Sequence, residues 1–244
     1  MLRDKINHLH LLIEESKEIV FFGGAGVSTS SGISDFRSAT GLYNQHTGGR
    51  YDPETILSHS FFVTHPKEFY DFHLSHLVMP NVKPNPAHYA LVELENRGKL
   101  KCIITQNIDG LHQQAGSKNV IELHGSAFDF YCLKCKKHFE LDFITAHRGL
   151  PRCSHCGGIV RPNVVLYEEP LNSQIIDQAI DALSSADLLI VGGTSLVVYP
   201  ATGLIDYYNG QDLVLINRDL TNHDHQATLL LRGDIAEILP VAIN

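Results

Sequence analysis

Short apolar runs alternate along the chain with segments of helical periodicity. Four short runs are almost entirely apolar, at 19–22, 102–105, 188–191 and 213–216. Three segments place apolar side chains at helical spacing, over 4–18, 87–97 and 174–184. Short continuous apolar runs are typical of parallel strands that are buried on both faces, and helices usually connect such strands. The pattern therefore predicts an α/β fold with a doubly wound, Rossmann-like parallel sheet.

Two segments do not follow this alternation. One, about 38–80, is rich in histidine, phenylalanine and tyrosine, and the other, about 127–160, contains four of the five cysteines. We interpret both as insertions that form a smaller lobe, the first helical and the second a cysteine-rich module. The Rossmann-like domain would then comprise 1–37, 81–126 and 161–244.

The overall composition narrows the class of protein. With 244 residues, of which 43% are hydrophobic and 19% are charged, the chain can bury a substantial core. No apolar run approaches the roughly 20 residues of a membrane helix, and the first residues do not resemble a signal peptide. The formal charge of -8 opposes generic binding to nucleic acid. We expect a cytoplasmic, monomeric protein whose partner is another protein or a small molecule, with no membrane partner.

Four cysteines form two Cys-x-x-Cys pairs, Cys132 with Cys135 and Cys153 with Cys156, and 17 residues separate the pairs. This spacing is typical of a zinc ribbon, in which four thiolates surround one ion and leave no open coordination position. Two glycines follow the second pair and supply the tight turn that such sites favour. We therefore predict structural zinc rather than redox-active thiols, although His155, inside the second pair, could also serve as a ligand.

A glycine-rich segment, 24–32, follows the first apolar run. Its backbone amides and a helix N-terminus could hold a diphosphate, as in dinucleotide-binding sites. The segment lacks the third glycine of Gly-x-Gly-x-x-Gly, and no suitable acidic residue for binding a ribose stands about 20 residues further on. An ordinary NAD dehydrogenase is therefore a poor match, and this segment alone leaves a purely structural glycine turn open.

Five further motifs follow one another in order. They read Gly-Ile-Ser-Asp-Phe-Arg (32–37), Thr-Gln-Asn-Ile-Asp-Gly-Leu-His (105–112), Glu-Leu-His-Gly (122–125), Gly-Thr-Ser-Leu-Val-Val-Tyr-Pro-Ala (193–201) and Ile-Asn (216–217). With the cysteine module between the third and the fourth, this set resembles the sirtuin family over nearly the whole chain, and most of all its compact bacterial deacetylases. The resemblance implies an enzyme that consumes NAD to remove acyl groups from protein lysines, releasing nicotinamide, 2′-O-acyl-ADP-ribose and free lysine.

The resemblance also implies which residues bind NAD. The nicotinamide ribose would lie against Gln106 and Asn107, and the carboxamide against the two residues that follow. Asp35 has the alternative role of bracing its loop, and Ser34 replaces a usual proline, which should loosen that loop slightly. The expected set is Gly24, Ala25, Gly26, Ser28, Thr29, Asp35, Phe36, Arg37, Gln106, Asn107, Ile108, Asp109, His124, Gly193, Thr194, Ser195, Asn217, Asp234 and Ile235.

The motif at 122–125 places His124 at the position of the family's general base. An imidazole that titrates near neutrality can accept a proton from a ribose hydroxyl at working pH. The chain has 15 histidines, and only the motif distinguishes this one. His124 and Asn107 are therefore the expected catalytic residues.

The segment 161–169 resembles the part of the family to which the substrate peptide adds as a strand. Val165, Leu166 and Tyr167 would contact the substrate, with modest sequence selectivity because strand addition reads the backbone. Here Glu168 stands where the family usually has glycine. If that glycine serves close backbone approach, the affinity for peptides should fall.

For the acyl group, the resemblance points to Ala39, Tyr70 and His73. Family members that accept succinyl or malonyl lysine have the small alanine, and an arginine at the position of His73 binds the acyl carboxylate. A neutral imidazole cannot replace that charged, two-pronged group. We therefore predict efficient removal of acetyl and short neutral acyl groups and slow removal of succinyl, with Ala39 leaving room for chains longer than acetyl.

Three other functions stay open. The same NAD pocket could serve a protein mono-ADP-ribosyltransferase, which needs no different motif. A non-catalytic sensor of NAD or ADP-ribose is a second alternative, although the presence of both His124 and Asn107 argues against it. A zinc-ribbon module for nucleic acid is conceivable because of Lys134, Lys136 and Lys137, but solvated lysines beside a zinc knuckle are the commoner case.

Overall fold

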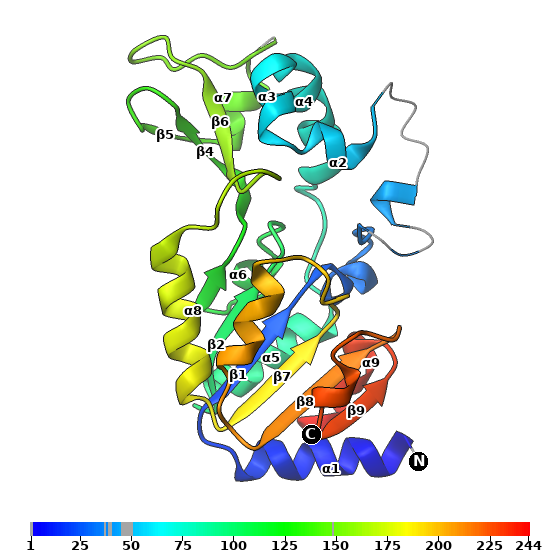
Figure 1. Ribbon diagram of the computed structural model, residues 1–244. Helices are drawn as coiled ribbons and strands as arrows, with labels where there is room; N and C mark the ends of the chain where they lie inside the picture. The colour runs from blue at the N-terminus through cyan, green and yellow to red at the C-terminus, as the bar shows by residue number, and fades with distance from the viewer. Residues whose placement is uncertain (1, 37, 39–40, 45–50, 148) are drawn as a thin grey trace.

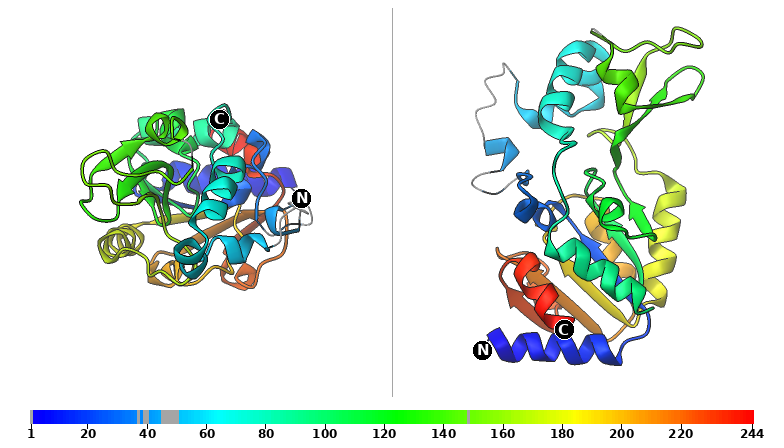
Figure 2. Two further views of the ribbon diagram at one scale, coloured as in Figure 1. Left: turned by 90° about the horizontal axis from the view of Figure 1, so that it is seen from above. Right: turned by 180° about the vertical axis from the view of Figure 1, so that it is seen from behind.

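The chain folds into two lobes, the smaller above the larger in Figure 1. The computed structural model describes residues 2–36, 38, 41–44, 51–147 and 149–244. The larger lobe is a six-stranded sheet with helices on both faces, and the smaller lobe is a three-stranded sheet beside a group of short helices (Figures 1 and 2). Both ends of the chain lie in the larger lobe, far from the smaller one.

The sheet of the larger lobe is entirely parallel. Its strands lie in the spatial order β3 (Val120–Glu122), β2 (Leu100–Thr105), β1 (Ile19–Gly23), β7 (Leu188–Gly192), β8 (Asp212–Asn217) and β9 (Leu229–Arg232). Every neighbouring pair runs in the same direction, which confirms the predicted doubly wound sheet. The edge strands β3 and β9 are not among the four strands expected from the apolar runs. Each of them is less completely buried than the central strands.

Helices cover both faces because successive strand residues point to opposite sides of the sheet. One layer consists of α1 (Leu2–Glu15), α5 (Pro86–Asn96) and α9 (Ile235–Ala242), and the other of α8 (Ser173–Ser185) and the 3₁₀ segment η5 (Ala201–Tyr207). Phe21 is buried in the first layer and Phe22 in the second. The three helices expected from periodicity correspond to α1, α5 and α8. Among the helices of the described residues, none combines the length and apolar character needed to cross a membrane.

The smaller lobe has its own core. Its elements are the strands β4 (Gly125–Cys132), β5 (His138–Glu140) and β6 (Val160–Val164), the helices α2 (Pro53–Ile56), α3 (His59–Thr64), α4 (Pro66–Phe72) and α7 (Leu141–Thr145), and a π-helical turn, η4 (His73–Leu77). The strand order is β5-β4-β6 with antiparallel pairing. Phe61, Phe62 and Phe69 from the helices pack with Phe130 from β4.

The strand β6 lies where the second insertion was expected to end. β6 pairs with β4, and Leu166 also packs in the core of the smaller lobe. The expected boundary between residues 160 and 161 therefore falls inside β6. We propose that the smaller lobe comprises the two insertions together with the chain to about residue 166.

The two Cys-x-x-Cys pairs converge beside the end of β4. Their four Sγ atoms all lie within 4.8 Å of one another, and His155 is not part of the group. Sγ atoms from opposite pairs are 3.4 and 3.6 Å apart, much longer than the roughly 2.05 Å of a disulfide. A Cβ at Gly158 would lie 2.9 Å from the Sγ of Cys132, so glycine is required next to the thiols. This donor set fits one tetrahedral zinc ion with four thiolate ligands.

Three histidines are buried without complete hydrogen bonding. His88 on α5 faces His112 on α6 (Leu111–Ala115), with the ring centroids 4.8 Å apart. Within the described part of the chain, neither ring nitrogen of His112 has a partner, and each of His73 and His88 has one nitrogen without a partner. Burial lowers the pKa of His73 and of His88 to about 4, and that of His112 to about 3.

Replacing Cys132 with alanine should abolish zinc binding and unfold the smaller lobe, because the binding of structural zinc is coupled to folding. We expect one tightly held zinc ion per wild-type chain, and none in the variant together with a lower melting temperature. Elemental analysis and calorimetry measure both. Cys102→Ala is the matched control, since Cys102 lies in β2, away from the cluster. Equal zinc content in the two variants would contradict the assignment.

Acid should destabilise the fold through the buried histidines. Their folded pKa values lie below the unfolded value of about 6.5, so the unfolded chain binds more protons and stability falls as pH decreases from about 7 toward 4. The expected loss at pH 5 is about 2 kcal/mol for each such histidine. Urea unfolding at pH 7.5 and pH 5 measures the change.

The variant His112→Leu tests the origin of this pH dependence. This variant should take up about one proton fewer per chain when it unfolds near pH 5.5. The exposed His8 offers the control, because His8→Leu removes no buried imidazole. An unaltered pH dependence in His112→Leu would assign the acid sensitivity to other groups.

Candidate functional site

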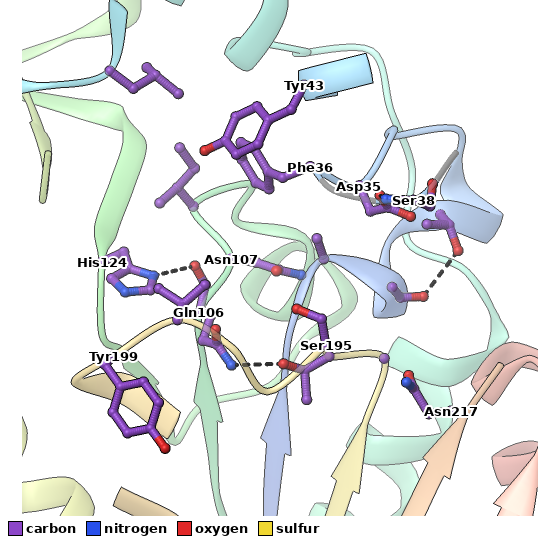
Figure 3. A pocket seen from close by; sticks show the side chains of 18 of the residues that line it. Asp35, Phe36, Ser38, Tyr43, Gln106, Asn107, His124, Ser195, Tyr199 and Asn217 are labelled. Carbon is purple, nitrogen blue, oxygen red and sulfur yellow. Dashed lines mark hydrogen bonds between the residues drawn. The ribbon is translucent and has the colours of Figure 1, made fainter. Parts of the chain in front are cut away.

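A cavity of about 340 Å³ lies at the carboxyl ends of β1 and β7. These two strands are neighbours, but β2 and β3 extend the sheet on the side of β1, whereas β8 and β9 extend it on the side of β7. The chain thus reverses its winding between them, and such a switch point is where doubly wound sheets bind ligands. Residues of both lobes line the cavity, and Figure 3 shows ten of them by name.

Most of the expected site residues line this cavity. They are Ala25, Gly26, Thr29, Asp35, Phe36, Gln106, Asn107, Ile108, His124, Val165, Leu166, Tyr167, Gly193, Thr194, Ser195, Asn217, Asp234 and Ile235. Those that lie in the structure but do not line the cavity are Gly24, Ser28, Asp109, Tyr70 and His73. Arg37 and Ala39 lie outside the described residues.

The loop after β1 packs directly on the segment after β7. The amide of Gly26 donates to the carbonyl of Gly193 at 2.7 Å. A Cβ at Gly26 would lie 2.8 Å from Cα of Gly193, and one at Gly24 would lie 2.7 Å from Cβ of Thr194. The two glycines are therefore required for this close packing. Where a helix N-terminus was expected, the loop forms two short 3₁₀ helices, η1 (Ala25–Val27) and η2 (Thr29–Ser31).

Below the cavity, three polar side chains form a connected series. Asn107 donates from Nδ2 to Oγ of Ser28 at 3.2 Å, and that hydroxyl donates to Oδ2 of Asp109 at 2.6 Å. The other oxygen of Asp109 accepts from the amide of Leu111, the first residue of α6. Burial raises the pKa of Asp109. In this structure the carboxylate of Asp109 connects Ser28 to the start of α6, and Asp109 does not line the cavity.

His124 lies between β3 and β4 with one ring nitrogen engaged. Its Nδ1 is 2.8 Å from the carbonyl oxygen of Gln106, which can only accept, so Nδ1 carries the proton and Nε2 keeps its lone pair. Burial lowers the pKa of His124, so the ring is neutral at pH 7. The side chain of Gln106 in turn donates to Oγ1 of Thr194 at 3.1 Å (Figure 3). The geometry therefore provides a neutral imidazole that can accept a proton.

The residue after His124 must be glycine. Gly125 has a φ of 75°, a conformation that L side chains rarely adopt. A Cβ there would lie 2.0 Å from the carbonyl oxygen of Asn163 on β6. Just beyond the end of β6, the amide of Val165 donates to the carbonyl of His124 at 3.0 Å. The position of the imidazole is thus set by the close pairing of β4 with β6.

At the opposite end, the cavity is bounded by the ends of β8 and β9. Asn217 closes β8, and Asp234 precedes α9. The carboxylate of Asp234 accepts from Oγ of Ser30 and from the guanidinium of Arg218, both at 2.6 Å, and also caps α9 through the amide of Ala236. Asp234 therefore ties the loop after β1 to this end of the cavity.

The segment after β6 forms the wall on the side of the smaller lobe. Arg161 makes two bonds to the carboxylate of Glu169, at 2.6 and 3.0 Å, and the amide of Leu166 donates to the same carboxylate. Tyr167 pairs through its backbone with the start of α3. Its hydroxyl is 2.6 Å from that of Tyr43. These contacts hold the segment from both sides.

Glu168 adopts a left-handed backbone conformation, which glycine favours. Its φ is 74°, in the left-handed region. The carboxylate accepts from the amide and from Oγ of Ser60, both at 2.9 Å. Glu168 therefore adds an anchored carboxylate to the lining of the cavity.

Asp35 and Phe36 belong to the motif at 32–37, which follows the loop after β1. Oδ1 of Asp35 accepts from the amide of Ser38 at 2.8 Å, in agreement with a bracing role. Phe36 packs against Tyr43 with ring centroids 5.5 Å apart, and both line the cavity. Arg37, which belongs to the same motif, is outside the described residues.

Tyr70 and His73 lie in the core of the smaller lobe, not at the cavity. The hydroxyl of Tyr70 donates to the carbonyl of Val160. His73 is fully buried, stacks on Phe69 and meets the edge of Phe130. In this structure the two side chains therefore do not line the cavity, and their contact with an acyl group stays a prediction. The Tyr-x-x-His pattern lies on α4 and η4, whose apolar residues are packed inside the lobe.

Several lining residues carried no signal in the sequence. Leu57 and Leu77 reach the cavity from the first insertion, whose placement no motif fixes. Tyr43 and Arg218 also line it. Tyr199 and Ile216 could have been anticipated, because they stand inside the motifs at 193–201 and 216–217.

Several proteins of similar sequence share the name of one enzyme, an NAD-dependent protein deacetylase. A family model described as the Sir2 family matches residues 24–200. The chain is 57% identical over 242 residues to a Clostridium perfringens protein named NAD-dependent protein deacetylase, covering 99% of each. It is 41% identical over 244 residues to a Staphylococcus epidermidis protein of the same name, covering 100% of this chain and 99% of that relative.

Solved structures of similar fold include complexes. A structure of a Sir2 enzyme has a TM-score of 0.89 at 38% identity, covering 99% of this chain and 97% of the other. A complex of Sir2 with a p53 peptide and NAD+ has a TM-score of 0.85 at 41% identity, covering 96% and 95%. A Sir2 variant with deacetylated p53 peptide and 3′-O-acetyl ADP ribose reaches 0.88 at 38% identity, covering 98% and 97%. Since the family match spans most of the chain and the relatives are similar over their whole lengths, this chain belongs to the Sir2 family.

Proposed function

We propose that this chain is an NAD-dependent protein lysine deacetylase, which yields nicotinamide, 2′-O-acetyl-ADP-ribose and free lysine. The observation that carries the proposal is that one cavity brings together a neutral His124, the buried amide of Asn107 and the loops that end β1 and β7. Relatives with this fold are named as deacetylases, and related structures hold NAD+ and acetyl ADP ribose.

Each part of NAD has a proposed set of contacts among the residues of the cavity. Ala25 and Thr29 would hold the phosphates with Thr194 and Ser195, and Asn217 would bind the adenosine ribose, with Asp234 and Ile235 beside the adenine. Gln106 and Asn107 would hold the nicotinamide ribose. When bound, NAD supplies a nicotinamide leaving group, whose departure opens the ribose carbon to attack by the acyl oxygen. The chain contributes orientation and the exclusion of water through Phe36 and Ile108.

His124 would act as the general base. With Nδ1 donating to a backbone carbonyl, Nε2 is available to take the proton of a ribose hydroxyl. The lowered pKa keeps the imidazole unprotonated at neutral pH. The same bond fixes the orientation of the ring, so little rearrangement is needed before the transfer.

The substrate peptide would lie along Val165, Leu166 and Tyr167. This segment lines the cavity and is joined to His124 through the amide of Val165. Recognition of the peptide backbone at such a segment gives affinity without strong sequence selectivity. The acyl-lysine side chain would then enter the cavity between this wall and Phe36.

A neutral acyl group suits the lining better than an acidic one. Among the lining residues that the structure describes, Arg218 is the one lysine or arginine, and it is paired with Asp234 at the other end of the cavity. No fixed cation of the described chain therefore meets an acyl carboxylate. Acetyl and short neutral chains are the proposed substrates.

Replacing His124 with alanine should lower deacetylation by about a hundredfold or more, because a positioned base is lost. Zinc content and melting temperature should change little, since the imidazole is bound to the chain by one hydrogen bond. The assay is mass spectrometry of an acetyl-lysine peptide with NAD. The exposed His225 supplies the control variant His225→Ala. Wild-type rates in His124→Ala would refute the assignment of the base.

The same assay separates the proposed reaction from ADP-ribosyl transfer. Deacetylation leaves a peptide lighter by one acetyl group and yields acetyl-ADP-ribose. Transfer of ADP-ribose to protein would instead give a heavier protein and no acetyl-ADP-ribose. Binding of NAD without any product would indicate a sensor.

The acyl preference can be measured as kcat/KM on one peptide that carries acetyl, butyryl or succinyl lysine. Succinyl should be slower than acetyl by about tenfold or more, because none of the described lining residues offers an unpaired guanidinium to its carboxylate. His73→Arg should not improve this rate, since it would place a cation inside the core of the smaller lobe and destabilise it. Faster desuccinylation by His73→Arg would indicate that the side chain at position 73 contacts the acyl group.

A further inference from the structure

The wall on the side of the smaller lobe carries one acidic side chain that the proposed reaction does not use. Glu168 lies in the lining of the cavity, with its side chain exposed. Its left-handed backbone directs the chain through a turn, and Ser60 on α3 holds the carboxylate with two hydrogen bonds. The carboxylate is therefore held at one place in the substrate-side wall.

The charge of Glu168 is not neutralised by the protein. Its neighbour Glu169 is paired with Arg161, which contacts both carboxylate oxygens. For Glu168, no lysine, arginine or histidine of the described chain lies within ion-pair distance, and both of its hydrogen-bond donors belong to the uncharged Ser60. A carboxylate offers about four acceptor positions, so two remain for a ligand.

The position of this charge indicates which ligand it serves. The cofactor's diphosphate is negative, and the proposed phosphate-binding residues come from the loops after β1 and β7. Glu168 instead belongs to the segment that connects β6 with α8, next to the residues Leu166 and Tyr167 proposed to contact the peptide. An uncompensated carboxylate there would attract a positive group of the protein substrate and repel a negative one.

We infer, resting on the proposed function, that Glu168 selects protein substrates that carry a lysine or arginine close in sequence to the acylated lysine. The acylated lysine itself is neutral, so the positive charge must come from a neighbouring residue. Because Ser60 already fixes the carboxylate, a basic side chain can pair with it without ordering the glutamate first. The effect belongs to peptide binding and not to the chemical step.

The test compares three acetyl-lysine peptides that differ only in two residues flanking the acetyl-lysine, which are arginine, alanine or glutamate. For the wild-type enzyme at low salt, kcat/KM should be about three- to fivefold higher for arginine than for alanine, and lower again for glutamate. The difference should lie in KM. It should shrink in 0.5 M salt, because exposed charges are screened.

Glu168→Gln should reduce the ratio between the arginine and glutamate peptides to near one. Glu168→Gly, which relieves the left-handed backbone, should do the same, so a folding defect in one variant does not obscure the result. Glu54→Gln removes an equal charge from an exposed site of the smaller lobe outside the cavity and should keep the wild-type ratio.

Two results would overturn the inference while leaving the deacetylase activity intact. One is a wild-type enzyme that turns over all three peptides equally well. The other is a preference for arginine that persists in Glu168→Gln and Glu168→Gly. Failure of the proposed function would look different, because none of the three peptides would then be deacetylated.

Discussion

The close contact between two backbone segments, at the ends of β1 and β7, determines where the whole site can form. The amide of Gly26 meets the carbonyl of Gly193, and neither position has room for a side chain. This contact brings the loop after β1 against the residues that follow β7. Gln106, at the end of the next strand, then reaches Thr194, and through its carbonyl it orients His124. The geometry of the site thus depends on the order of the strands and on the lack of space for a side chain at these two glycines.

The other side of the cavity depends on a buried ion pair. Arg161 is only 5% exposed and uses its two-pronged guanidinium on Glu169. Removing one partner of such a pair commonly costs about 3–5 kcal/mol, because the remaining charge is left buried. The pair holds the turn after β6, so Glu169 is a structural residue whereas Glu168, one position earlier, keeps its charge for a ligand. Adjacent residues of the same type therefore have different roles.

Much of the fold could be predicted from local patterns. The short apolar runs indicated the central strands, and the cysteine spacing indicated the cluster, because both are properties of short segments. The motif at 122–125 likewise singled out His124 among 15 histidines. His73 could not be placed in this way, since its burial depends on how α4 packs on β4. Asp234 was expected at the site, but its bonds to Ser30 and Arg218 could not be predicted, because these partners come from distant parts of the chain.

Gly125 shows that a sequence motif can reflect a steric requirement as well as a catalytic one. The imidazole of His124 supplies the chemistry, but the glycine beside it lets β4 approach the backbone of Asn163 and so fixes where the imidazole stands. A relative that kept the histidine and acquired any larger residue at the next position would have to separate the two strands. When sequences are searched for active relatives of this chain, the His-Gly pair is therefore a better criterion than the histidine alone.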